Sequence, residues 1–280
     1  MKHAVVTGAT SGLGLAVSRR LAAEGYAVTV VGRDEGRGAA AARDVGGRFL
    51  RTDLSVLGEV RALAVRLADE GPIDVLVNNV GGMWVRPWTT ADGVDGVFAL
   101  NHLSPFVLTE NVLGSLSVGS RVVAVTSSSI TTIPMAGELE YREAAVSGDY
   151  YGMPASGRAK LAHLSYVLDL AERLADRGVT VLAADPGAAA TPNAAEMTPE
   201  ILPPALRAHW EQIWQGVQTP SEAAADPIVW AATDTELVGR TGQIVGPGRV
   251  PADALADPLT PVLRAAAAGL TARTLAVALR

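Results

Sequence analysis

Short apolar runs alternate along the chain with longer segments whose apolar residues recur every three or four positions. The spacing of Leu13, Ala16 and Val17 is typical of a helix with one buried face. The short runs are rich in β-branched residues and lack the polar alternation of a half-exposed strand, which indicates strands buried on both faces. We therefore predict strands at residues 4–7, 27–31, 48–52, 73–78, 121–126, 179–184 and 243–245.

Strand and helix repeat at intervals of about 25 residues, which predicts a doubly wound parallel sheet with helices on both faces. No segment resembles an interdomain linker, so we expect one α/β domain, residues 1–280. A proline-rich stretch at about 188–219 is longer than an ordinary connection, and we predict a substrate lid or a disordered insert there. The Ala-rich tail at about 251–280 is predicted to be helical and to pack on the surface or against another subunit.

Composition narrows the possible functions. The chain has 280 residues, a formal net charge of −6 and no cysteine, which excludes a disulfide scaffold, a thiolate nucleophile and cysteine-ligated metals. The acidic balance argues against a nucleic-acid partner. No apolar stretch approaches the roughly 18–20 residues of a membrane span, and no secretory signal is recognisable, so we expect a cytoplasmic protein. Because the histidines lack metal-ligand spacing, we predict no metal site and expect each to be hydrogen-bonded or exposed: His3, His102, His163 and His209.

The first apolar run ends in a glycine-rich turn, TGATSGLG at 7–14, that leads directly into a helix. Glycine allows positive φ and a close approach of the backbone to a pyrophosphate. The N-terminus of the following helix offers free N–H groups to the phosphate charge. In this context the turn predicts a dinucleotide site formed by Gly8, Thr10, Ser11, Gly12, Leu13 and Gly14.

The residues after the second apolar run bear on the choice of cofactor. An acidic residue there would bind the ribose 2′-hydroxyl of NAD, whereas this chain has Arg33, whose guanidinium suits a 2′-phosphate. The neighbouring Asp34 could still accept a hydroxyl. The sequence therefore favours NADP(H) and leaves NAD(H) as the alternative.

Several motifs in the expected order resemble the classical short-chain dehydrogenase/reductase family. They are the glycine turn, Asn-Asn-Val-Gly at 78–81, and Pro-Gly at 186–187 followed by Thr191, while residues 90–103 are similar to the retinol-dehydrogenase-like branch. The resemblance spans roughly residues 1–265 and implies a Rossmann-type fold. It also implies cofactor contacts from Asp53, Leu54, Asn79, Val80, Gly81, Pro186, Gly187 and Thr191.

The resemblance implies a catalytic serine, tyrosine and lysine, with an asparagine behind them. It assigns carbonyl orientation to Ser127, ribose binding to Lys160 and a supporting role to Asn101; Ser128 and Ser129 leave the serine's assignment open by one position. The tyrosine position, four residues before Lys160, holds Ser156 in an ungapped match. The catalytic tyrosine of the family is therefore missing.

A serine hydroxyl is a weaker acid than a phenol and reaches less far. We consider three sources for the proton: a water near Ser156, a nearby tyrosine (Tyr150 or Tyr151), or the substrate itself. None of the five tyrosines occupies position 156: Tyr26, Tyr141, Tyr150, Tyr151 and Tyr166.

Two tryptophan pairs flank the expected substrate side, Trp84 with Trp88 and Trp210 with Trp214. They indicate a bulky aromatic or polycyclic substrate, or alternatively hydrophobic packing of the lid or of a subunit contact.

Our first hypothesis is an atypical NADP(H)-dependent ketoreductase that acts on a small molecule. The alternatives are a non-redox enzyme of the same fold (a cyclase, dehydratase or isomerase) and an NADP(H)-binding pseudoenzyme or sensor. By family analogy we expect a homo-oligomer built through the helices after strands four and five, with neither a nucleic-acid nor a membrane partner.

Overall fold

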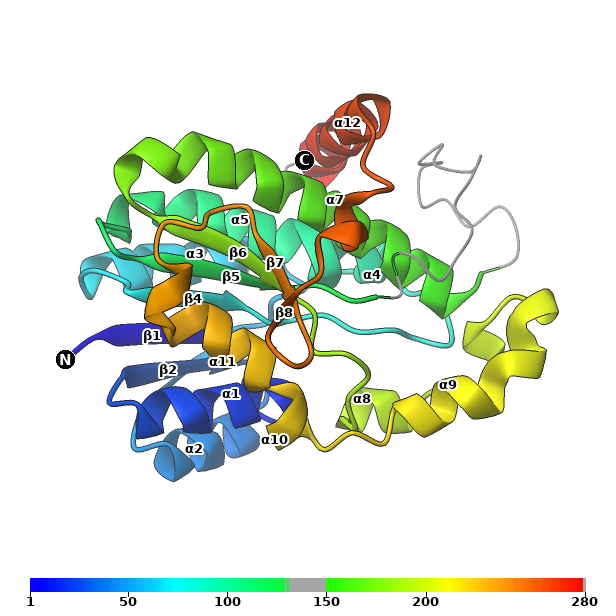
Figure 1. The fold of residues 1–280 in the computed structure, drawn as a ribbon, viewed down its shortest axis with the longest axis horizontal. Coiled ribbons are helices and arrows are strands. Elements are labelled where there is room, and N and C mark those ends of the chain that lie inside the picture. The colour runs from blue at the N-terminus through cyan, green and yellow to red at the C-terminus, as the bar shows by residue number, and fades with distance from the viewer. Residues whose placement is uncertain (129, 131–149, 279–280) are drawn as a thin grey trace.

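The computed structural model describes residues 1–128, 130 and 150–278 of the chain. Within them, eight strands form one sheet in the order β3-β2-β1-β4-β5-β6-β7-β8 (Figure 1). The first seven strands pair in parallel, and β8 runs antiparallel to β7. Their bounds are β1 His3–Thr7, β2 Ala27–Gly32, β3 Arg48–Arg51, β4 Val75–Asn78, β5 Arg121–Val125, β6 Thr180–Ala184, β7 Ile244–Gly246 and β8 Val250–Pro251.

The predicted α/β fold with a parallel sheet is confirmed. The strands begin or end one or two residues from the predicted positions; β4, for example, starts at Val75 rather than at Ile73. The amide of Ile73 instead donates to Ser115 O at 2.9 Å. The sequence did not predict β8, which is two residues long and ends in a proline. Such a short segment has no periodicity to detect.

Helices cover both faces of the sheet (Figure 1). On one side lie α3, α5 and α7, and on the other α1, α2 and α11. Their bounds are α1 Gly12–Ala23, α2 Glu35–Asp44, α3 Leu57–Asp69, α5 Ser104–Val112, α7 Gly152–Leu174 and α11 Asp226–Thr233.

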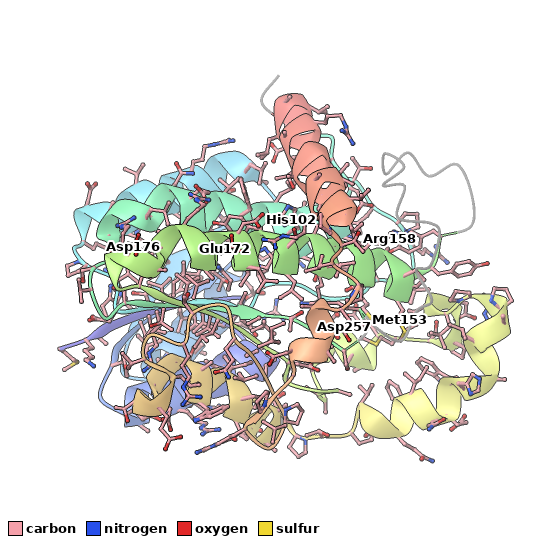
Figure 2. All side chains as sticks on the ribbon, turned by 45° about the horizontal axis from the view of Figure 1, so that its top comes forward. His102, Met153, Arg158, Glu172, Asp176 and Asp257 are labelled. Carbon is pink, nitrogen blue, oxygen red and sulfur yellow. The ribbon has the colours of Figure 1, made fainter. Side chains whose placement is uncertain are left out.

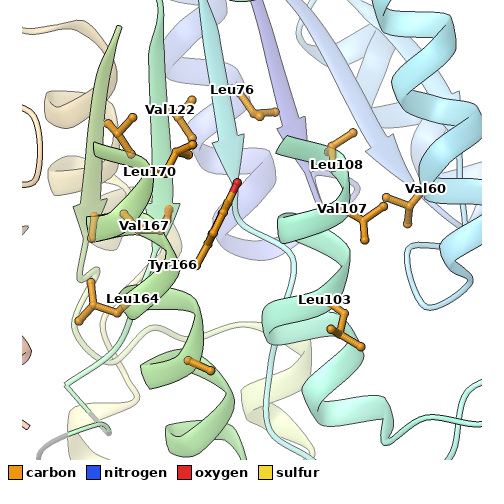
Figure 3. Close-up of a cluster of buried hydrophobic side chains, with 14 of the residues drawn as sticks. Val60, Leu76, Leu103, Val107, Leu108, Val122, Leu164, Tyr166, Val167 and Leu170 are labelled. Atoms are coloured by element: carbon orange, nitrogen blue, oxygen red, sulfur yellow. The ribbon is translucent and has the colours of Figure 1, made fainter. Parts of the chain in front are cut away.

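Alternate residues of each strand point into two separate cores. Val5 and Leu76 pack with α3, α5 and α7, whereas their neighbours Val6 and Val77 pack with α1 and α11. Figure 3 shows the first core, in which Tyr166 of α7 lies among the leucine and valine side chains. Because both faces of the central strands are buried, these strands are almost entirely apolar, whereas the edge strand β3 carries the exposed Arg48 and Arg51.

The strand order reverses between β1 and β4, which are neighbours in the sheet although β2 and β3 come between them in the chain. In such sheets the crevice at the carboxyl ends of the strands, where the order reverses, is the usual ligand site. The predicted glycine turn follows β1, and the Asn-Asn-Val-Gly turn follows β4, so both lie at this crevice.

The stretch predicted as a lid or disordered insert contains short helices. These are α8 Pro192–Ala195, η4 Pro199–Ile201, η5 Pro204–His209 and α9 Trp210–Gly216. The chain then forms α10, Ser221–Ala224. The tail carries the helix α12, Pro261–Ala278, which packs on α7, where Arg264 forms an ion pair with Asp169. Within the described residues, no helix combines the length and the apolarity that a membrane crossing needs.

Candidate active site

The glycine turn after β1 has the backbone geometry of a phosphate site. Gly8 and Gly12 have φ of +62° and +52°, which side-chain-bearing residues rarely adopt. A Cβ atom added at Gly14 would lie 2.4 Å from the carbonyl oxygen of Gly8, so a residue with a side chain would clash with the backbone there. The turn leads into α1, whose first amide groups therefore face the crevice.

Asn79 ties this turn to the end of β4. Its Nδ2 donates to Thr7 O at 2.8 Å and to Gly8 O at 3.3 Å. The backbone amides of Asn79 and Val80 both donate to Thr7 Oγ1, at 3.0 and 3.1 Å. In the described structure this predicted cofactor residue thus supports the turn that would hold the phosphates.

Arg33 is exposed at the end of β2, next to the glycine turn. A Cβ on the preceding Gly32 would lie 2.5 Å from Thr10 Cγ2, which shows how closely the two turns approach. Asp34 caps α2 by accepting the Arg37 amide at 2.8 Å, and its side chain pairs with that of Arg37 at 3.3 Å. The hydrogen bond from the Arg37 amide lowers the pKa of Asp34. The carboxylate that could accept a ribose hydroxyl is thus already bonded to its own helix.

Asp53 and Leu54 follow β3 on the same edge of the sheet, where the Thr52 amide donates to Gly32 O at 2.9 Å. Asp53 Oδ1 accepts the amide and the hydroxyl of Ser55 at 2.9 and 2.7 Å, and Leu54 is buried. The predicted cofactor residues Asp53 and Leu54 thus follow β3 at the edge where it meets the end of β2.

Gly81, Asn101 and Lys160 come together at the carboxyl edge of the sheet. A Cβ on Gly81 would lie 2.5 Å from Asn101 Oδ1 and 3.7 Å from Lys160 Nζ. Lys160 donates from Nζ to Val125 O at 2.9 Å. Burial lowers the pKa of Lys160 to about 8, and the Asp185 carboxylate opposes that shift.

Asn101 lies in a π-helical turn, η1 Ala99–Leu103, a feature that often marks functional sites. Its Nδ2 donates to Gly82 O at 3.0 Å and to Val97 O at 2.9 Å, and its Oδ1 accepts the Gly82 amide at 3.1 Å. These bonds tie the loop after β4 to the helix.

Ser156 lies one helical turn before Lys160 on α7. Its side chain is fully buried, and Oγ has no hydrogen-bond partner among the described residues. Ser127, two residues after β5, is half-buried, and Ser128 is exposed. Ser129 and Tyr141 lie outside the described residues.

Tyr150 and Tyr151 come immediately before α7. The Tyr150 hydroxyl donates to Trp84 O at 3.1 Å. Burial, and to a lesser degree the charge of Asp95, raises the pKa of Tyr150 to about 12. Tyr151 is half-buried and directly precedes the first residue of the helix.

The tryptophans form the two pairs that the sequence indicated, in separate places. Trp84 and Trp88 meet edge to face at 5.7 Å between ring centres. Trp210 and Trp214 stack at 5.4 Å in the lid. Trp84 and Trp88 line a cavity of about 400 Å³ with Met83, Val85, Arg86, Pro87 and Glu196.

The segment at about 188–219, predicted as a lid or a disordered insert, packs against the start of α7. Met153, Ile201 and Leu202 form a small hydrophobic cluster against which Trp210 packs, and Figure 2 shows Met153 beside the lid helices. Asn193 of α8 donates from Nδ2 to Met83 O at 2.9 Å and accepts the Met83 amide on Oδ1 at 3.0 Å.

The base of the lid also meets the glycine turn. A Cβ on Gly12 would lie 3.2 Å from both Thr191 and Pro192. Thr191 caps α8 by accepting the Ala194 amide at 3.1 Å. The predicted lid residue Thr191 is thereby brought to the phosphate turn.

Sequence reasoning missed Asp185, which directly precedes Pro186 and Gly187. It is 5% exposed, and its Oδ1 accepts the Gly187 amide at 3.0 Å. Burial raises the pKa of Asp185, while the Gly187 amide and the Lys160 charge oppose that shift. The sequence does carry a signal that could have identified Asp185, namely an acidic residue placed directly after a buried strand.

The expectation that every histidine is hydrogen-bonded or exposed is wrong for His163. Its side chain is buried, and neither ring nitrogen has a partner among the described residues. His102 lies against it at 5.7 Å between ring centres and is bonded through Nε2 to Thr271 Oγ1 at 2.7 Å. The apolar helix faces that bury the pair carry no acceptor for His163.

The family model described as short chain dehydrogenase matches residues 2–201. Human retinol dehydrogenase 13 is 30% identical over 258 residues, which cover 86% of this chain and 75% of that protein. Polyprenol dehydrogenase of Danio rerio is 34% identical over 269 residues, covering 89% of this chain and 79% of that protein. The match to mouse retinol dehydrogenase 12, 34% identical, covers 66% of this chain and 61% of that protein.

Solved structures share the fold over most of the chain. A dehydrogenase/reductase from Sinorhizobium meliloti 1021 superposes with a TM-score of 0.68 at 26% identity, over 88% of this chain and 92% of that one. A short chain dehydrogenase from Burkholderia cenocepacia in complex with NADP gives 0.68 at 24% identity, over 88% and 95%, which shows the fold alone. With the family model matched over residues 2–201, the chain belongs to the short-chain dehydrogenase family of NAD(P)-dependent oxidoreductases.

Proposed function

We propose that this protein is an NADP(H)-dependent ketoreductase that reduces a carbonyl on a bulky aromatic or polycyclic small molecule without a phenolic proton donor at position 156. One observation carries the proposal: Lys160 and Asn101 meet Gly81 at the carboxyl edge, while a buried serine occupies the position one turn before the lysine. In the proposed site, Lys160 can therefore bind the cofactor although position 156 offers no phenol to donate a proton.

The residues present fit a dinucleotide. The turn at Gly8 and Gly12 would receive the pyrophosphate, and Lys160 would hold the ribose hydroxyls on the nicotinamide side. Arg33 would bind the 2′-phosphate of NADP(H), and the engagement of Asp34 by Arg37 supports this choice over NAD(H). The bound cofactor supplies the hydride.

The carbonyl would be oriented by Ser127, and the proton must come from a group other than a phenol at 156. Tyr150 is a poor candidate because its hydroxyl is bonded to Trp84 O and burial raises its pKa to about 12. Water near Ser156, Tyr151 or the substrate itself therefore supplies the proton in our proposal. Loss of a positioned general acid typically costs about 10²–10⁴-fold in rate, so we expect slow turnover of simple ketones.

The proposed substrate class is supported by the cavity of about 400 Å³ that the loop after β4 lines. Trp84 and Trp88 offer flat apolar walls, and Arg86 and Glu196 supply polar groups at its edge. A fused-ring substrate would use the stacking that these walls offer.

A second function has support from the buried Ser156 hydroxyl, which has no partner among the described residues. In that alternative the chain binds NADP(H), and its reaction is a cyclisation, dehydration or isomerisation without net redox change.

The two functions are separated by following NADPH absorbance with a panel of polycyclic ketones. We expect slow NADPH consumption by the wild type and faster reduction of simple ketones by Ser156→Tyr. Lys160→Met serves as the control that should abolish both. Tight NADPH binding with no consumption by either protein would contradict the ketoreductase and favour the non-redox alternative.

A further inference from the structure

The carboxylate of Asp185 lies at the floor of the candidate site. Strand β6 ends at Ala184, which pairs with Val125 of β5, and the Thr126 amide donates to Ala184 O at 2.9 Å. Asp185 is the next residue and is 5% exposed. Sheet register therefore brings it alongside the segment that carries Ser127.

Lys160 reaches the same place from α7. Its Nζ donates to the carbonyl of Val125, the residue that pairs with Ala184. The ammonium and the Asp185 carboxylate consequently attract each other across the ends of β5 and β6. A buried ammonium is costly unless a counter-charge is near.

The surroundings of this pair contain few other charges. The amides of Gly187 and Ser128 and the Ser128 hydroxyl donate to the Asp185 carboxylate. On the lysine's own helix lies His163, which faces His102 of η1; burial lowers the pKa of both histidines, so both are neutral near pH 7. Among the described residues Asp185 is the anionic partner of Lys160.

We propose that Asp185 is a positioning residue that keeps the Lys160 ammonium protonated and aligned in a site where position 156 offers no phenol. The same carboxylate holds Ser128, and with it the backbone next to Ser127. The inference rests on the proposed function, because Lys160 acts here as the group that binds the cofactor ribose.

Asp185→Asn tests the charge alone, since the amide keeps the shape and still accepts the Gly187 N–H. NADPH affinity is measured by fluorescence titration between about pH 6 and about pH 9.5, the range in which a lysine of lowered pKa titrates. The wild type should lose affinity as the pH rises through about 8. In Asp185→Asn this midpoint should fall by about one pH unit, because loss of a close counter-charge disfavours the ammonium.

Three further variants distinguish this role from a merely structural one. Lys160→Met should bind weakly with no midpoint, and Asp185→Glu should keep the wild-type midpoint even if its affinity drops. Asp44→Asn, which removes an exposed carboxylate paired with Arg19, should change nothing. Weaker binding of Asp185→Asn at every pH with an unmoved midpoint would overturn the proposal.

A second measurement needs neither cofactor nor turnover. The ordinary lysine pKa is 10.5, and that of Lys160 is about 8. Between these values the unfolded chain binds more protons, so the free energy of unfolding should rise with pH. In Asp185→Asn the rise should begin at lower pH, and in Lys160→Met it should shrink. An identical rise in wild type and Asp185→Asn would refute the inference even if NADPH did not bind, whereas a shifted rise without ketone reduction would refute only the proposed reaction.

Discussion

Ser156 lies one helical turn before Lys160 on α7, and its buried hydroxyl has no hydrogen-bond partner among the described residues. The lysine, in contrast, is bonded to Val125 O and faces Asp185. The residues that would hold a cofactor are therefore fixed by hydrogen bonds. Ser156, at the position that would donate the proton, makes no side-chain hydrogen bond with the described residues.

Replacing Ser156 with alanine should leave stability unchanged or raise it. A buried hydroxyl without a partner carries a desolvation cost of about 1–3 kcal/mol, so its removal should increase the free energy of unfolding by up to about 1 kcal/mol in urea denaturation. Ser104→Ala is the matched control, because Ser104 on α5 is also buried with an unpartnered hydroxyl. If turnover drops about 100-fold in Ser156→Ala alone, the serine relays the proton.

Replacing Arg33 with serine should weaken NADPH binding and spare NADH. Charge-assisted hydrogen bonds to a 2′-phosphate are worth about 1.5–3 kcal/mol, so we expect the Kd for NADPH to rise about 10- to 100-fold. Arg43→Ser, on the exposed last turn of α2, controls for general electrostatics. Equal loss of affinity for NADPH and NADH would place the 2′-phosphate elsewhere.

Replacing Asn193 with alanine should loosen the lid. The substitution removes both hydrogen bonds to the backbone of Met83, together worth about 1–2 kcal/mol. We expect proteolytic cleavage within residues 196–216 to accelerate about 5- to 30-fold. Asn111→Ala removes a side-chain bond on α5 away from the lid and should not change that rate. Unchanged cleavage in Asn193→Ala would mean that the hydrophobic cluster around Met153 holds the lid without this latch.

The buried histidines should make the protein sensitive to acid. Burial lowers the pKa of His102 from 6.5 to about 3, and burial, His102 and Lys160 lower that of His163. Below about pH 6.5 the unfolded chain therefore binds protons that the folded chain excludes, and the free energy of unfolding falls with pH by up to about 1.4 kcal/mol per unit for each histidine.

Urea denaturation at several pH values between about 7.5 and 4.5 measures this slope. His163→Leu should flatten it, because leucine fills the same apolar site without a titrating group. His209→Leu, at an exposed position, should leave the slope as it is. An unaltered slope in His163→Leu would assign the acid sensitivity to other groups.

The sequence alone was sufficient to predict the features that depend on residues close together in the chain. Apolar periodicity showed which segments are strands and helices, and the glycine turn after the first strand indicated the phosphate site. The four-residue spacing of Ser156 and Lys160 puts them on one helix face in any helical structure, so the sequence alone predicted a serine hydroxyl one turn before the lysine.

Only the tertiary structure determined which distant groups meet. The electrostatic pairing of Asp185 with Lys160 depends on the register of β5 against β6 and on the bond from α7 that brings Lys160 Nζ to Val125 O. Likewise, the packing of the helices around His163 leaves it buried with no hydrogen-bond partner among the described residues. Periodicity shows which face of an element is buried, but it carries no information about which side chains from other elements lie opposite that face.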